Sequence, residues 1–182
     1  MALIYLIRHG RAAAGFTDNI DPGLDDLGKT QADDAASVLQ EHLPLSLVSS
    51  PLLRAQETAS PLAERTQQQV IIENRIAEIP SPGLSLAQRG PWLSEVMAGR
   101  WSEQSEDLQS WRTKLLQCLL EQEANTAMFS HFVAINAALG LATEIDEIFL
   151  FRPDNGSITI LDNAGGKLNL VTRGEEAATK VN

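Results

Sequence analysis

The chain has 182 residues, of which 43% are hydrophobic and 21% charged, a composition ordinary for one globular domain with a buried core. The formal net charge of −10 argues against a general nucleic-acid binder or a protein that binds anionic membranes. A single cysteine, Cys118, excludes an intramolecular disulfide and fits a reducing compartment. No apolar run has the ~20 residues needed to span a bilayer. The N-terminal segment also lacks a secretory signal, so we expect a cytoplasmic protein.

The first part of the chain alternates between predicted strands and helices. Residues 3–7 form a continuous apolar run, typical of a strand that is covered on both faces. A turn-rich stretch follows, and the alanines of residues 29–41 recur at helical spacing. Residues 45–50 predict a second short buried strand.

The helix predicted after this second strand contains two prolines. Pro51 suits the first turn, with Ser49 or Ser50 as the N-cap. Pro61 lies further along and predicts a kink or an early end of the helix.

The second half of the chain continues the alternation. Residues 70–73 predict a third strand, and residues 79–101, with three prolines and two tryptophans, predict an irregular or short-helical excursion over the site. Leucines and a tryptophan at helical spacing predict an amphipathic helix over residues 108–120. Residues 126–130 predict a strand, and residues 132–140 a helix that ends at its glycine.

The C-terminal part predicts a hairpin, "SITILD" and "KLNLVT" joined by "NAGG", followed by a polar tail over residues 175–182. Alternating strands and helices predict an α/β protein. We therefore expect one domain over residues 1–182, a three-layer α/β/α sandwich with a mostly parallel central sheet and helices on both faces.

Polar residues follow three of the predicted strands at equivalent positions. Arg8 and His9 end the first strand, Arg54 lies in the first turn of the helix after the second, and His131 follows the strand over residues 126–130. Ligands of parallel α/β sheets bind at the carboxyl ends of strands, where helix N-termini favour anions. Guanidinium groups bind phosphate oxygens in pairs, and a neutral imidazole can attack phosphorus. The sequence therefore predicts a phosphoryl-binding pocket.

The motifs that carry these residues resemble those of a known family. "LIRHG", "SSPLLRAQETA" about forty residues later, and "SH" before a late helix are similar to the histidine phosphatase superfamily, the phosphoglycerate mutase-like group. The resemblance implies the same sandwich fold, no metal and no cofactor. It implies that His9 is phosphorylated, that Arg8, Arg54 and His131 complete the phosphate pocket, and that Glu78 in "NRIAEIPSPG" is the general acid.

Three further function classes compete with a metal-independent phosphatase acting on a phosphorylated small molecule or a phosphoprotein. A mutase would shelter the phosphohistidine from water, and it usually needs more covering chain and more cations. A silent regulatory module would have lost chemistry, although both histidines and both arginines are present. A metal hydrolase would need a histidine pair at i, i+4 on a helix, which the sequence lacks. The sequence predicts no nucleic-acid or membrane partner and leaves the oligomeric state open.

Several positions depart from the family's common form. The residues after "RHG" are often polar, whereas here Arg11 is followed by three alanines, 12–14. Small residues often follow the second histidine, whereas here Phe132 does. The "G-W-E-G" segment of many members is absent. These departures leave the phosphate pocket in place and prevent any transfer of substrate identity.

Four residues near the predicted excursion or the first loop are possible substrate contacts. Arg11 could contact substrate or be a solvated loop arginine, and Arg89 lies where the family has its variable lid. Trp92 and Trp101 could line the site, although packing is the favoured interpretation.

Other residues receive a structural interpretation. Glu57 and Glu73 could be confused with Glu78, and we expect Glu57 to pair with a cation on its own helix. His42, beside Pro44, is interpreted as a surface or helix-end residue. Gly10 is expected to let the chain turn beside the bound group without a Cβ in the way.

Overall fold

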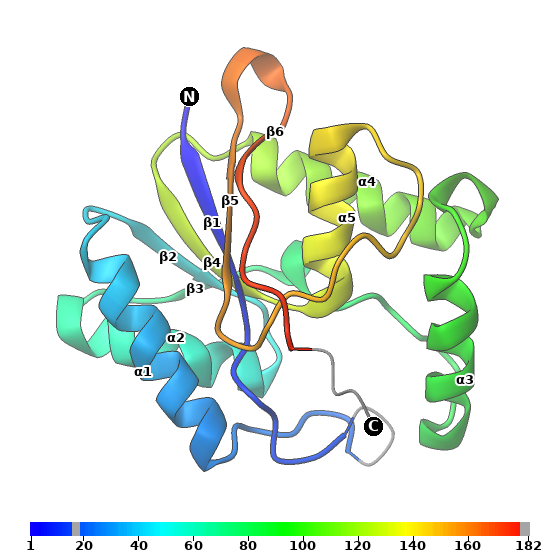
Figure 1. Ribbon diagram of the computed structural model, residues 1–182, viewed down its shortest axis with the longest axis horizontal. Coiled ribbons are helices and arrows are strands. Elements are labelled where there is room, and N and C mark those ends of the chain that lie inside the picture. Colours follow the sequence, from blue (N-terminus) through cyan, green and yellow to red (C-terminus); the bar gives the residue numbers. More distant parts are fainter. Residues whose placement is uncertain (16–18, 179–182) are drawn as a thin grey trace.

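The computed structural model describes residues 1–15 and 19–178 (Figure 1). These residues form a sheet of six strands in the order β3-β2-β4-β1-β5-β6. The strands are β1 (Leu3–Arg8), β2 (Ser46–Ser49), β3 (Ile71–Ile72), β4 (Thr126–Ser130), β5 (Ile158–Asp162) and β6 (Asn169–Thr172). The pairs β2–β3, β2–β4 and β1–β4 are parallel, whereas β5 pairs antiparallel with both β1 and β6. The predicted mostly parallel sheet and terminal hairpin are confirmed.

Helices cover both faces of this sheet (Figure 1). They are α1 (Asp26–Gln40), α2 (Leu53–Thr66), α3 (Leu86–Met97), α4 (Glu106–Leu120) and α5 (Phe132–Thr143). Helices α1 and α2 pack on one face, and α4 and α5 on the other, which confirms the three-layer sandwich. None of the helices in the described ranges is long and apolar enough to cross a membrane.

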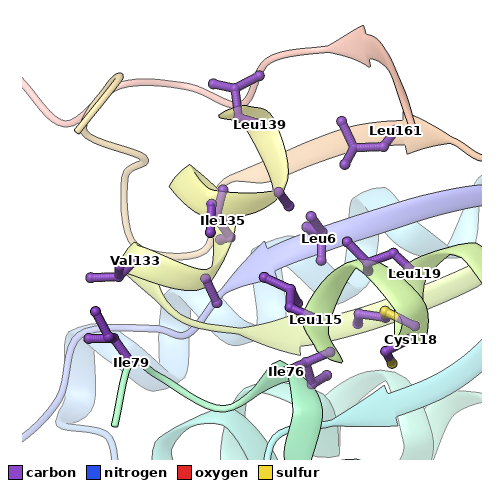
Figure 2. Packing of buried hydrophobic residues seen from close by; sticks show 14 of the residues in the cluster. Leu6, Ile76, Ile79, Leu115, Cys118, Leu119, Val133, Ile135, Leu139 and Leu161 are labelled. Atoms are coloured by element: carbon purple, nitrogen blue, oxygen red, sulfur yellow. The ribbon is translucent and has the colours of Figure 1, made fainter. Parts of the chain in front are cut away.

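The alternation of side chains along β1 explains why its whole sequence is apolar. Tyr5 and Ile7 belong to the buried cluster that includes α1 and α2. Ile4 and Leu6 belong to the second cluster, in which Figure 2 shows Leu6 beside side chains of α4 and α5. Successive strand residues point to opposite faces, so a strand between two helical layers needs apolar residues at every position.

The start of α2 differs from the predicted cap. The helix begins at Leu53, and Pro51 lies before it. The Leu53 N–H donates to Asp21 Oδ1 at 2.8 Å, so a side chain from the loop before α1 satisfies the helix end. Ser50 Oγ accepts from the Leu52 N–H at 3.2 Å, and neither predicted serine is the N-cap.

The predicted early end of α2 at Pro61 and the predicted end of α5 at Gly140 are both wrong. Helix α2 continues through Pro61 to Thr66, because burial of its apolar face against the sheet compensates for the lost hydrogen bond. Helix α5 does not end at Gly140 but three residues later, before Glu144 in the left-handed conformation. A Cβ at Gly140 would lie 2.9 Å from Ile145 O, so this glycine admits the returning chain.

The segment predicted as an irregular or short-helical excursion and the polar C-terminal segment both make defined hydrogen bonds. The excursion over residues 79–101 contains α3, and the Ser85 N–H before this helix donates to Gln88 Oε1 at 3.0 Å. In the polar C-terminal segment, Asp154 N donates to Glu175 O at 2.8 Å and Ala177 N to Arg152 O at 2.9 Å. Residues 179–182 lie outside the described ranges.

Candidate active site

The four residues predicted from the strand ends lie together at the carboxyl edge of the sheet. In Figure 1, β1 runs downward from the N-terminus, and this strand ends at Arg8. Arg8 is paired with Ser130 of β4, and the His9 N–H donates to Ser130 O at 3.0 Å. His131 follows β4 directly, and its ring centroid lies 5.1 Å from that of His9. Parallel pairing of β1 with β4 therefore brings the two histidines together.

Hydrogen bonds assign the tautomer of His9. Arg54 Nε donates to His9 Nε2 at 3.1 Å, so Nε2 is the acceptor nitrogen. The proton is then on Nδ1, which donates to Gly10 O at 2.7 Å. Burial, the charge of Arg54 and that of Arg8 lower the pKa of His9 to about 3. His9 is therefore neutral near pH 7, with the lone pair of Nε2 directed toward Arg54.

His131 is fully buried, and hydrogen bonds in the described residues account for one of its two ring nitrogens. Its Nε2 lies 2.7 Å from Ser50 Oγ, and that oxygen already accepts from the Leu52 N–H. The Ser50 hydroxyl can donate its hydrogen to Nε2 in the tautomer that carries the His131 proton on Nδ1. Within the described ranges this Nδ1 has no hydrogen-bond partner. Burial and the neighbouring His9 and Arg54 lower the pKa of His131 well below its usual value.

The two arginines are held by backbone and side-chain contacts. One terminal nitrogen of Arg8 donates to Pro153 O at 2.7 Å, and its guanidinium lies over the Phe132 ring, 5.1 Å from the centroid. Its Nε is buried without a partner in the described part of the chain. A terminal nitrogen of Arg54 lies 3.9 Å from Asp21 Oδ1. Burial lowers the pKa of both guanidinium groups, but an arginine starts so far above neutrality that both stay charged at pH 7.

Glu78 brings an acid to the same place. Its carboxyl group accepts from the Ile79 N–H at 3.0 Å and from the Val133 N–H, in the first turn of α5, at 3.1 Å. These donors and the two arginines favour the carboxylate, but desolvation outweighs them and raises the pKa of Glu78. The result is a carboxyl group that holds a proton to a higher pH than an exposed glutamate.

The two competing glutamates have structural partners elsewhere. Glu73 forms an ion pair with Arg75 at 2.8 Å, and this partner lowers the pKa of the carboxyl group. The prediction that Glu57 pairs with a cation on its own helix is wrong. Its carboxylate accepts from the Leu24 N–H and lies against Gly23, where the absence of a side chain lets the loop before α1 approach α2.

A cavity of about 500 Å³ lies at this edge of the sheet, and the fully buried His131 is not among its described lining residues. The cavity is lined by Arg8, His9, Arg54 and Glu78 and by Arg11 from the loop after β1. The Arg11 Nε is bound to Asp25 Oδ2 at 2.6 Å. Arg89 does not line the cavity: its Nε donates to Ser81 Oγ at 2.9 Å, although its charge still lowers the pKa of Arg54.

The two tryptophans of the excursion pack and do not line this cavity. Trp101 is 1% exposed, and the Arg112 guanidinium lies over its ring, while Trp92 packs against the core. Instead, Leu93 and Met97 of α3 line the cavity, and the sequence interpretation missed both. Their i, i+4 spacing would have placed them on one helix face, which is the signal that could have found them.

The expected role of Gly10 is wrong. A Cβ at this position would not point at a ligand but would lie 2.3 Å from Gly28 O in α1. The Gly10 N–H donates to Thr58 Oγ1 at 3.0 Å, and that hydroxyl donates to Arg54 O at 2.6 Å. Thr58, which the sequence interpretation also missed, therefore links the backbone after His9 to the helix that carries Arg54.

His42 lies away from the cavity, and the described residues form no metal-binding cluster. His42 is exposed, and its ring lies 5.0 Å from that of Tyr5, away from the cavity. Over residues 1–15 and 19–178, no group of three or more histidine, cysteine, aspartate or glutamate side chains could hold a metal ion.

The chain is similar in sequence to known phosphatases and mutases. A glucosyl-3-phosphoglycerate phosphatase from Mycolicibacterium vanbaalenii is 40% identical over 79 residues, 41% of this chain and 35% of that protein. The chain thus matches about a third of that relative. A 2,3-bisphosphoglycerate-dependent phosphoglycerate mutase from Thermoplasma acidophilum is 26% identical over 92% of this chain and 90% of its own.

A solved structure extends the similarity to the whole fold. The mycobacterial glucosyl-3-phosphoglycerate phosphatase with inorganic phosphate has a TM-score of 0.72 at 25% identity, over 97% of this chain and 98% of that one. The family model of the histidine phosphatase superfamily (branch 1) matches residues 4–176. Because this match spans nearly the whole chain, the protein belongs to the histidine phosphatase superfamily, branch 1.

Proposed function

We propose that the protein is a metal-independent phosphatase that hydrolyses a phosphomonoester through a phosphohistidine on His9. The main support is that a neutral imidazole, two guanidinium groups and a carboxyl group of raised pKa share one cavity. Membership of a phosphatase superfamily and relatives named as phosphatases support the same activity. The two arginines disfavour a bound metal cation in this pocket, because their charges would repel it.

Binding of the phosphoryl group follows from the donors that the site holds. Arg8 and Arg54 supply positive charge and paired N–H donors for the equatorial oxygens. Within residues 1–15 and 19–178, Arg8 Nε and His131 Nδ1 are buried atoms without a hydrogen-bond partner, and with the His131 proton on Nδ1 phosphate oxygens would accept from both. In this arrangement Arg54 moves its Nε hydrogen bond from His9 to a phosphate oxygen, which frees the lone pair of Nε2.

In the first step, His9 Nε2 forms a bond to phosphorus while the ester P–O bond breaks. Glu78 gives its proton to the leaving oxygen, so the product departs as a neutral alcohol. The phosphorylated ring keeps its proton on Nδ1, and Gly10 O accepts the hydrogen bond that stabilises it. The arginines offset the charge on the transferred group, which supplies much of the rate in a loose transition state.

In the second step, water replaces the histidine on phosphorus. The Glu78 carboxylate takes a proton from the attacking water, the new P–O bond forms and the N–P bond to His9 breaks. Inorganic phosphate leaves, and His9 and protonated Glu78 are restored. A mutase would instead return the phosphoryl group to a bound acceptor.

The test is the formation and decay of the phosphoenzyme in single-turnover experiments with a labelled phosphomonoester. We expect an acid-labile phosphoenzyme that releases phosphate without an acceptor, in the presence of a chelator, and a complete loss of both signals in His9→Ala. His42→Ala is the matched control, because this exposed histidine lies outside the cavity. Full activity of His9→Ala would contradict the proposal, and decay that requires an acceptor would favour the mutase.

We also propose that the protein works in the cytoplasm. Its one cysteine, Cys118, is buried between α4 and the sheet, and burial raises the pKa of the thiol to about 12. A buried thiol of high pKa stays protonated and unreactive, and a chain with one cysteine has no internal disulfide that would need an oxidising compartment. Fractionation of the native host cells, with the protein in the cytosolic fraction, is the expected result.

A further inference from the structure

Most of the cavity lining outside the proposed phosphate-binding groups is apolar. Three alanines, 12–14, come from the loop after β1, and Leu93 and Met97 come from α3. Phe132, the first residue of α5, completes what we call the apolar wall: residues 12–14, Leu93, Met97 and Phe132. These side chains come from three separate elements, so they face one space only because the fold brings them together.

Phe132 is fixed in place by a continuous series of ring contacts. Its ring is stacked on that of Phe149, with centroids 6.2 Å apart and planes 13° apart. The Arg8 guanidinium also lies over Phe132, and the Arg152 guanidinium lies over Phe149, 5.5 Å from its centroid. A ring held by both neighbours loses little freedom when a ligand packs against it, so Phe132 is a preorganised surface.

Three polar side chains beside the apolar wall each have at least one partner, and one of them, Asn19, accepts from the Asp21 N–H at 3.1 Å. Among the described lining residues, Arg11 is the cation that remains after Arg8 and Arg54, and it is bound to Asp25. Asn155 donates its amide to His9 O at 2.9 Å. A carboxylate or hydroxyl on the leaving group would meet no side-chain hydrogen-bond donor on the apolar wall itself and would lose part of its water there.

We propose that the substrate is a phosphomonoester of an apolar alcohol, with an aromatic or aliphatic group that packs on the apolar wall. This inference rests on the proposed phosphatase function and adds the chemical class of the leaving group. The cavity of about 500 Å³ is in the range that holds small organic ligands, and it exceeds the volume of a phosphoryl group alone.

The test compares substrates whose leaving groups are chemically alike but differ in apolar length. Ethyl, butyl and hexyl phosphate, with benzyl phosphate as the aromatic member, are compared with phosphoserine and 3-phosphoglycerate, and His9→Ala is the blank. We expect kcat/KM to rise up to about fourfold per added methylene, the ratio that corresponds to burying one such group. Hexyl and benzyl phosphate then exceed both polar substrates by roughly 100-fold, which is about three to four such increments.

Variants of the apolar wall separate packing from chemistry. Leu93→Ala and Met97→Ala should flatten the dependence on chain length, because they lower kcat/KM for hexyl phosphate more than for ethyl phosphate. Leu86→Ala is the matched control, since Leu86 lies on the same helix but does not line the cavity. Ala13→Arg places a cation on the wall and should raise the ratio of 3-phosphoglycerate to hexyl phosphate by about tenfold.

The outcomes distinguish this inference from the function on which it rests. His9-dependent hydrolysis that shows no chain-length dependence and favours phosphoserine or 3-phosphoglycerate overturns the apolar substrate and leaves the phosphatase standing. No hydrolysis of any member above the His9→Ala blank overturns both. Chain-length dependence that survives unchanged in Leu93→Ala and Met97→Ala also overturns the assignment to this wall.

Discussion

Residue by residue, desolvation acts on His9 and Glu78 in opposite directions. Burial disfavours the charged form of each group, so it lowers the pKa of the imidazole and raises that of the carboxyl group. The same environment thus keeps the imidazole unprotonated near neutral pH and shifts the carboxyl group toward its protonated form. Arg8 and Arg54 reinforce the shift of His9 and oppose that of Glu78. A neutral imidazole and a carboxyl group of raised pKa therefore share one cavity.

The proton of Glu78 leads to a prediction about pH and leaving groups. Because the first step needs protonated Glu78, the rate of phosphoenzyme formation should fall as pH rises through its raised pKa. Glu78→Gln keeps an acceptor for the Ile79 and Val133 N–H groups but cannot give a proton. It should lose roughly 10²–10⁴ in rate with an alkyl phosphate. Single-turnover rates across pH measure both effects.

A good leaving group provides the control for this prediction. p-Nitrophenyl phosphate needs little protonation of its leaving oxygen, so Glu78→Gln should lose much less rate with it. Equal losses with the two substrates, or an unchanged pH limb in the variant, would contradict the role of Glu78 as the acid.

At the level of elements, β1 and α1 meet through two glycines. A Cβ at Gly10 would lie 2.3 Å from Gly28 O, and a Cβ at Gly28 would lie 2.1 Å from Arg11 O. No side chain fits at either position, because the neighbouring atoms are backbone and cannot rotate away. The contact holds the segment after His9 against the first turn of α1, whose start is capped by Asp25.

This contact gives Gly28→Ala an effect opposite to that expected from helix propensity. Replacing glycine by alanine inside a helix ordinarily stabilises a protein by about 0.5–1 kcal/mol. Here the clash should instead lower the free energy of unfolding by about 1–3 kcal/mol. In a protein of this size each kcal/mol lowers Tm by about 2–4 °C. Thermal unfolding measures the shift, with the exposed α1 variant Thr30→Ala as the control.

An increase of Tm in Gly28→Ala would show that the β1 loop can move away from α1. We expect the reverse, together with a lower kcat, because the displaced segment includes the Gly10 carbonyl that accepts from His9 Nδ1.

For the molecule as a whole, the buried site lowers stability in acid. In the unfolded chain a histidine has a pKa of about 6.5. The folded state lowers that of His9 to about 3 and also lowers that of His131. Between these values the unfolded state binds more protons, so stability is present above pH 6.5 and decreases as pH falls toward 3. Glu78, whose pKa is raised, contributes in the opposite sense as pH rises above 4.5.

The corresponding prediction compares His9→Asn with the parent protein. Urea unfolding at several pH values between 7 and 4 should show a smaller loss of unfolding free energy in the variant, since asparagine does not titrate. All other titrating groups are shared by the two proteins, so the difference in slope isolates His9. Identical slopes would contradict a neutral, buried His9 in the folded state.

Much of the fold could be predicted from the sequence because it depends on local patterns. The apolar run of β1 and the spacing of α4 identify these elements directly, since each reflects the number of faces that the element buries. The boundaries at Pro61 and Gly140 could not be predicted, because packing against other parts of the chain outweighs the intrinsic preference of each residue.

The sequence by itself determined the family, the sandwich and the residues Arg8, His9, Arg54 and His131, because short motifs at strand ends carry all of them. Only the tertiary structure decided which groups surround them. Leu93 and Met97 line the cavity and Trp92 does not, Arg89 lies outside it, and Gly10 serves the contact with α1. These outcomes depend on how segments distant in sequence approach one another, and local spacing carries no information about that approach.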